Sequence, residues 1–110
     1  MKTTFTLFKE VFGDEKVFLY IEELPEEKTY YIKVEGDIIE EELSKLSLPD
    51  RLKDDLRGDI VNIVKGYNIM MSGKIYNEQN NELCKEYFRF ALKKFCQLHG
   101  SFYKFKEELI

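Results

Sequence analysis

The chain has 110 residues, of which 44% are hydrophobic, 15% aromatic and 35% charged, and its formal net charge is −4. This length suits a single domain over residues 1–110, and the aromatic content is far too high for a disordered chain. The negative charge counts against a protein that binds nucleic acid by neutralising phosphates, and no segment approaches the roughly 18 apolar residues of a membrane span. We therefore expect a soluble, cytoplasmic protein.

Three N-terminal segments alternate apolar and polar residues with period two, which predicts β-strands. They cover residues 3–12, 17–22 and 29–35, with turn-forming residues between them. The first two strands should form an antiparallel hairpin, and all three a β-meander. One face of this sheet is aliphatic. The other face is expected to carry five aromatic side chains: Phe8, Phe12, Phe18, Tyr20 and Tyr31.

From residue 38 the apolar residues recur at spacings of three and four, which predicts helices. A short helix is expected over 38–46. Residues 48–71 have an amphipathic pattern, but Gly58 followed by Asp59 resembles a helix stop and a new cap, so we expect two helices, 48–57 and 59–71. The strongest pattern is a helix over 79–99, whose apolar arc is wide enough to indicate burial on two sides.

The expected fold is therefore α+β: a three-stranded antiparallel β-meander packed against three to four helices, with the long 79–99 helix at the centre. Residues 101–105 fit either a fourth short strand or a helical turn, and we favour the strand. Cys84 and Cys96 lie on the 79–99 helix about 18 Å apart, too far for a disulfide, so both thiols should be reduced.

Acidic residues are concentrated between positions 22 and 42, where nine carboxylates accompany two lysines. One interpretation is a solvated loop. The other is a docking surface for a basic protein, because spaced carboxylates present charge to Lys and Arg much as phosphates do. Together with the aromatic face, this segment supplies the candidate partner-binding residues: Glu22, Glu23, Glu26, Glu27, Glu35, Asp37, Glu40, Glu41, Phe18, Tyr20 and Tyr31.

Catalytic and metal-binding patterns are weak. His99 is the single histidine, and although Cys96 is three residues before it, Cys84 is too distant to complete a tetrahedral metal site. No serine has an evident partner base, and there is no glycine-rich phosphate loop. We therefore expect a protein that is not an enzyme and that has no cofactor and no metal.

Three hypotheses for the function follow. The leading one is a small acidic intracellular protein-binding module, an inhibitor or adaptor that occupies a surface of a macromolecular partner, such as a phage or mobile-element inhibitor of a nucleic-acid-binding enzyme. The second is a homodimeric subunit joined through the aromatic face or the 79–99 helix. The third is a single-strand nucleic-acid binder that stacks bases on the aromatic face, which the acidic surroundings disfavour. A cover formed by Phe102 and Phe105 from the C-terminal segment would instead leave that face structural.

Overall fold

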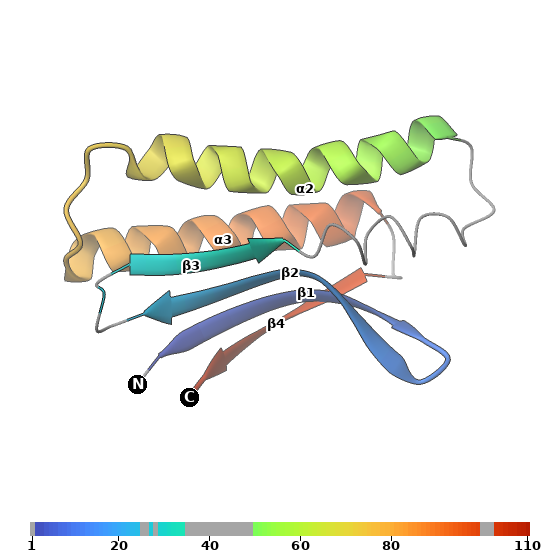
Figure 1. Ribbon diagram of the computed structural model, residues 1–110, viewed down its shortest axis with the longest axis horizontal. Helices are drawn as coiled ribbons and strands as arrows, with labels where there is room; N and C mark the ends of the chain where they lie inside the picture. Colours follow the sequence, from blue (N-terminus) through green and yellow to red (C-terminus); the bar gives the residue numbers. More distant parts are fainter. Residues whose placement is uncertain (1, 25–26, 28, 35–49, 100–102) are drawn as a thin grey trace.

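The computed structural model describes residues 2–24, 27, 29–34, 50–99 and 103–110. These residues form a four-stranded antiparallel sheet and two helices (Figure 1). The strands are β1 (Thr3–Val11), β2 (Asp14–Leu24), β3 (Thr29–Val34) and β4 (Tyr103–Leu109), and the helices are α2 (Asp50–Met71) and α3 (Glu78–Leu98). The prediction of an α+β fold is confirmed. The expected helix over 38–46 lies outside the described residues.

The sheet has the order β3-β2-β1-β4, so the first three strands form the predicted meander and the C-terminal strand joins at the far edge. β4 is longer than the predicted strand at 101–105, and it pairs with β1 from Thr3 opposite Leu109 to Lys9 opposite Tyr103. At the end of this ladder Lys2 and Ile110 exchange two backbone hydrogen bonds of 2.9 and 2.8 Å. The two ends of the described chain therefore lie side by side.

A β-bulge in β2 changes which side chains face the helices. Leu7 pairs with Leu19 but Phe8 pairs with Val17, which leaves Phe18 as an extra residue. An extra residue interrupts the alternation of a strand, so Phe18 and Leu19 both join the core between sheet and helices. Phe18 is only 2% exposed, and the prediction that it lies on the outer face beside Tyr20 is wrong.

Helix α2 is continuous from Asp50 to Met71, so the predicted break between residues 57 and 59 is wrong. A glycine inside a helix costs about 1 kcal/mol, which is not enough to end a helix whose apolar stripe continues in phase. Leu56 and Ile60 are both buried on that stripe, one turn before and just after Gly58. Asp59 is not an N-cap, since its carboxylate accepts a 2.7 Å hydrogen bond from His99.

Helix α3 confirms the prediction of a helix over 79–99 almost to the residue. It begins after Asn77, whose side chain accepts a hydrogen bond from the backbone N–H of Asn80. Its buried face centres on Phe88, whose ring packs against those of Tyr67 (5.1 Å between centroids) and Phe5 (5.7 Å). Cys84 and Cys96 are both free, as expected.

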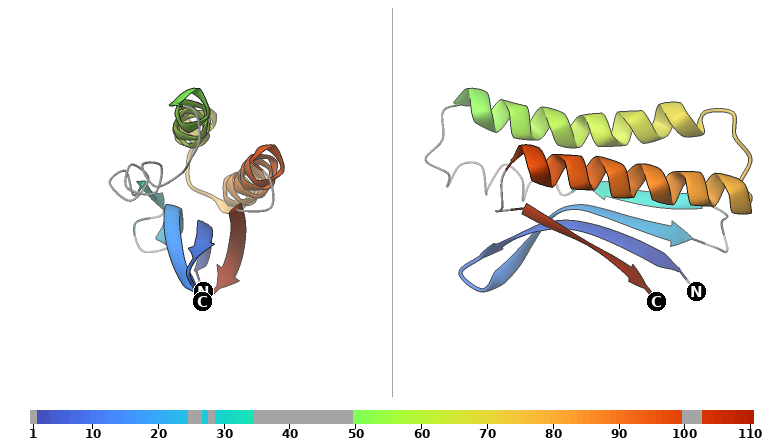
Figure 2. Two further views of the ribbon diagram at one scale, coloured as in Figure 1. Left: turned by 90° about the vertical axis from the view of Figure 1, so that its right-hand side faces the viewer. Right: turned by 180° about the vertical axis from the view of Figure 1, so that it is seen from behind.

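Both helices lie on the same face of the sheet, and α2 is the more distant of the two (Figure 2). The core fills the space between this helical layer and the inner face of the sheet. Among the described elements, none covers the opposite face. Three surfaces are therefore candidate binding sites: the outer face of the sheet, the end of the β1–β2 hairpin, and the side of the helices that points away from the sheet.

Candidate functional site

The predicted acidic docking surface is only partly described. Glu26, Glu35, Asp37, Glu40 and Glu41 lie outside the described residues, and Glu27 is exposed. Glu22 and Glu23 are adjacent in β2 and so point to opposite faces of the sheet. The Glu22 carboxylate forms an ion pair with Lys2. The charge of Glu22 is therefore already neutralised within the chain.

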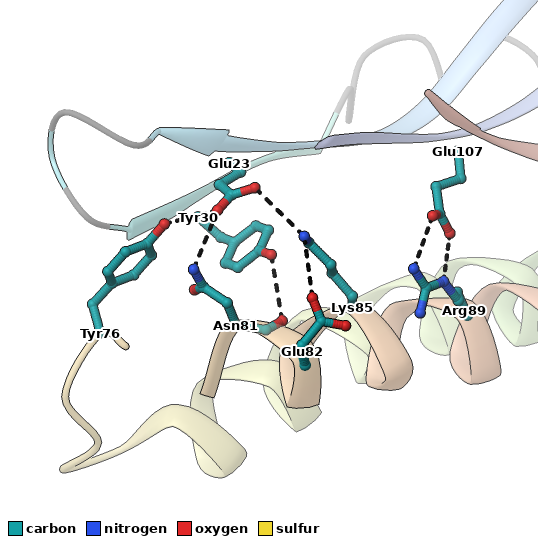
Figure 3. A network of polar contacts seen from close by, with 8 residues as sticks. All are labelled: Glu23, Tyr30, Tyr76, Asn81, Glu82, Lys85, Arg89 and Glu107. Carbon is teal, nitrogen blue, oxygen red and sulfur yellow. Dashed lines mark hydrogen bonds and ion pairs between the residues drawn. The ribbon is translucent and has the colours of Figure 1, made fainter. Parts of the chain in front are cut away.

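Glu23 is a buried structural carboxylate, only 7% exposed, and not part of an open surface (Figure 3). The Tyr76 hydroxyl donates a 2.7 Å hydrogen bond to it, and the Asn81 amide donates one of 3.2 Å. The Lys85 ammonium lies 4.0 Å from its second oxygen. Burial and the bond to Glu23 together raise the pKa of the Tyr76 hydroxyl. These contacts fasten the start of α3, and the loop before it, to β2.

The aromatic face is less open than the alternating pattern predicted. Phe18 is in the core, and Phe8 is buried on the outer face with the Lys106 ammonium 5.1 Å from its ring centroid. Tyr20 is half-buried, so the exposed aromatics among the predicted residues of this face are Tyr31 and, at the tip of the β1–β2 hairpin, Phe12. β4 lies within the sheet and Phe105 packs against the core, so the described part of the C-terminal segment does not cover the face from outside; Phe102 lies outside the described residues.

Four of the charged residues on this outer face form ion pairs within the chain. Besides the pair of Lys2 with Glu22, Lys106 forms a 2.9 Å ion pair with Glu15. Surface pairs of this kind contribute little to stability, but they reduce the charge that a partner would meet. The described outer face is thus neither strongly acidic nor an aromatic platform.

The end of the β1–β2 hairpin is a different kind of surface. β3 pairs with β2 only from Leu19 onward, and β4 pairs with β1 only as far as Lys9, so the described sheet does not flank the hairpin end (Figure 1). A two-residue turn, Phe12–Gly13, connects the paired residues Val11 and Asp14. The hairpin therefore projects beyond the rest of the described sheet, with Phe12 at its tip.

Phe12 has an unusual backbone conformation and a fully exposed ring. Its φ is +55° and that of Gly13 is +85°, as in the type I′ turns that favour Asn-Gly at these two positions. A residue with a Cβ in this region costs about 1–2 kcal/mol, and Phe lacks the short polar side chain that lets Asn adopt it. The fold thus holds a large apolar side chain in water at a position where Asn would be more stable.

The cross-strand pairs behind the tip are also unfavourable. Lys9 is directly opposite Lys16, and Glu10 is directly opposite Glu15. Like charges in directly opposed positions destabilise an antiparallel pair by a few tenths of a kcal/mol. Both pairs lie within the projecting part of the hairpin. Together with Phe12, they show that this hairpin end is not optimised for the stability of the isolated chain.

The helical layer exposes a second set of apolar side chains. Ile69 of α2 and Phe90 of α3 are 78% and 69% exposed, and Leu83 of α3 is 38% exposed. We call these three residues the outer helix patch. Cys84, Phe88, Leu92 and Phe95 form the buried stripe of α3, and Phe90 lies two residues from Phe88 and Leu92, on the far side of the helix.

Reactive chemistry is sparse in the described part of the chain. Groups of three or more His, Cys, Asp or Glu side chains that could hold a metal are absent from it. His99 bonds to Asp59, and burial raises the pKa of both the Cys84 and the Cys96 thiols, which lowers their nucleophilicity at neutral pH. Neither described helix has the length and apolar content needed to cross a bilayer.

Two site features escaped the sequence analysis although signals for them were present. Glu23 is two residues after Ile21, so strict alternation already places it on the inner face. Phe12 precedes Gly13, and a glycine at the second position of a two-residue turn is typical of type I′ hairpins. No protein-family model, curated protein or solved structure matches this chain.

Proposed function

We propose that this chain is a small protein-binding module, an inhibitor or adaptor, that inserts the tip of its β1–β2 hairpin into a pocket on a macromolecular partner. One observation carries the proposal: Phe12 combines a positive φ with a fully exposed ring. Strained conformations of this kind concentrate at functional sites, where the interaction they serve offsets their cost.

The geometry of the tip suits an anchor residue. Energetic hot spots of protein interfaces are enriched in aromatic side chains that fill a pocket and are ringed by weaker contacts. Phe12 projects beyond the flanking strands, so a concave partner can surround it without meeting the rest of the sheet. Its ring is exposed before binding, and the turn already fixes its direction, which limits the entropy lost on association.

The charges beside Phe12 indicate the chemistry of the partner. Glu10 and Glu15 face each other across the hairpin, and a cationic side chain placed between them relieves their repulsion. Lys106 reaches Glu15 but is not paired with Glu10. We therefore propose a partner whose apolar pocket has a basic rim. The acidic residues between 22 and 42 can add longer-range attraction to the same basic surface.

Replacing Phe12 separates the proposed function from folding. Phe12→Asn puts the favoured residue into the type I′ turn, so the free protein should become more stable by about 1 kcal/mol in chemical denaturation. Binding should weaken at least tenfold, because an anchoring aromatic side chain typically contributes 2 kcal/mol or more. A benzophenone-bearing phenylalanine analogue in place of Phe12 should then crosslink to the partner directly.

The matched control is Tyr31→Thr, which removes an exposed aromatic ring from the outer face of the sheet. It should leave binding unchanged, and a photoreactive group at that position should give no crosslink. The proposal is refuted if Tyr31→Thr abolishes binding while Phe12→Asn does not, since the sheet face is then the docking surface. A Phe12→Asn variant that is less stable than the wild type would show that the turn is not strained.

A further inference from the structure

The outer helix patch lies on one continuous surface of the helix pair. Two contacts fix how α2 and α3 are aligned: the Tyr87 hydroxyl donates a 2.6 Å hydrogen bond to the carbonyl of Ile63, and the sulfur atoms of Cys84 and Met71 are 3.1 Å apart. In this antiparallel alignment Ile69 is level with the turn of α3 that follows Leu83. Leu83 and Phe90 are two turns apart on the same side of α3.

Two charged residues of opposite sign lie at equal distances from Phe90 on that side of α3. Glu86 is four residues before it and Lys94 four residues after it. Both side chains are exposed, and within the described part of the chain neither forms an ion pair. Leu83, seven residues before Phe90, lies on the same side, whereas the exposed Leu98, eight residues after Phe90, is turned about 80° away from it.

We infer that the outer helix patch binds a second copy of this chain, with the two α3 helices antiparallel and Phe90 at the twofold axis. In a twofold interface each residue before Phe90 meets the residue the same distance after it on the other copy. Glu86 then faces the partner copy's Lys94, and Lys94 faces the partner copy's Glu86. The two Phe90 rings stack at the centre, and each Leu83 contacts the far end of the other helix.

The observed pattern favours a second copy over a foreign partner. One helix carries both signs of charge at equal distances from a central aromatic residue, which makes its surface complementary to itself. α3 has 21 residues and is about 31 Å long, so it extends well beyond residues 86 and 94 in both directions. At the usual 8–10 Å between helix axes, Glu86 of one copy and Lys94 of the other are within reach of each other. The contact is smaller than the standard interface of about 800 Å² per partner, so the dissociation constant should be micromolar.

This interface does not involve the hairpin tip. The mass of the protein in solution tests whether it forms. Sedimentation equilibrium from about 1 to 300 μM should show the mass rising from 13.2 kDa toward twice that value. Phe90→Gln keeps a good helix former at an exposed position and should raise the dissociation constant at least tenfold. A monomer at every concentration would overturn the inference.

Charge exchange tests the register of the two helices. Glu86→Lys brings two positive charges together at both symmetric positions, and Lys94→Glu brings two negative charges together, so each variant alone should be monomeric. An equimolar mixture of the two variants should form a heterodimer, because both contacts then join opposite charges. Glu108→Lys makes the same charge change on the other face of the sheet and should leave the dimer intact.

Two results would contradict this arrangement. If the wild type dimerises but Phe90→Gln does so equally well, the copies associate through another face. If the mixture of Glu86→Lys and Lys94→Glu stays monomeric while the wild type dimerises, the helices do not cross at Phe90. Circular dichroism of each variant, compared with the wild type, establishes that loss of the dimer is not loss of the helices.

Discussion

Helix α2 contains two glycines whose replacement by alanine should have opposite effects. A Cβ added to Gly58 has no neighbour within 4 Å, whereas a Cβ added to Gly66 would collide with the hydroxyl of Tyr87. That hydroxyl is held in place by its 2.6 Å hydrogen bond to the carbonyl of Ile63. Gly66 is therefore the residue that allows α3 to approach α2 this closely.

The size of each effect follows from these surroundings. Gly58→Ala removes backbone freedom from the unfolded chain and should stabilise the protein by about 0.5–1 kcal/mol. Gly66→Ala gains the same amount but forces Tyr87 to move, which loses a hydrogen bond of about 1 kcal/mol and adds an overpacking cost of about 1–3 kcal/mol. The net expectation for Gly66→Ala is a destabilisation of about 1–3 kcal/mol.

Urea denaturation followed by circular dichroism measures both changes, and a protein concentration near 1 μM keeps the copies dissociated. Tyr87→Phe removes the hydroxyl that causes the collision. In that background the penalty for Gly66→Ala should fall by at least half, and the double-mutant cycle gives the coupling directly. If Gly58→Ala and Gly66→Ala stabilise the protein equally, the close packing of α2 on Tyr87 is wrong.

Two further outcomes concern the polar contacts between the sheet and α3. Glu23→Ala leaves the Tyr76 hydroxyl and the Asn81 amide without their acceptor, so it should lower the free energy of unfolding in urea by about 2–4 kcal/mol. Glu23→Gln keeps an acceptor and should lower it by about half as much. Equal effects of the two variants would argue against the network. Arg89 holds Glu107 through bonds of 2.6 and 2.9 Å, which lower the pKa of that carboxyl from its ordinary 4.5. The folded pKa lies below the unfolded one, so the pair stabilises the fold above the ordinary pKa and ceases to do so as pH falls through the lowered value. Arg89→Gln should therefore reduce stability by up to about 1 kcal/mol at neutral pH and have no effect in strong acid; a loss of stability that is the same at every pH would contradict this interpretation.

Local periodicity was enough to predict most of the secondary structure. Alternation located the first three strands, and the 3.6-residue spacing located α3, because in both cases one face is continuously buried. The two-residue alternation of a strand does not reveal where an extra residue is inserted. The bulge at Phe18 places this ring in the core and not on the expected outer face. The helix break predicted at Gly58 is wrong for a related reason. The weak helix propensity of glycine affects one position, whereas the burial of Leu56 and Ile60 stabilises the helix on both sides of it.

The functional surfaces were less accessible from the sequence than the fold. Composition pointed to the acidic segment, yet of its described carboxylates Glu22 is paired, Glu23 is buried and Glu27 alone is exposed. Phe12 was expected on an aromatic face with four other rings, and it differs from them in its backbone conformation and its full exposure, which the sequence pattern does not reveal. Leu83 and Phe90 of the outer helix patch lay within the wide apolar arc of α3, and a helical wheel does not show which part of a wide arc stays uncovered.

The pairing of β1 with both β2 and β4 has a consequence for the order of folding. The β1–β2 hairpin closes a turn of two residues, whereas the β1–β4 ladder joins residues 3–9 to residues 103–109. Closing such a long loop is entropically costly and slow, so this ladder should form late. On the ribosome, one edge of β1 stays unpaired until residues 103–109 have left the exit tunnel. During that interval a newly made chain can pair this edge with another nascent chain, and chaperones would be needed most at this stage.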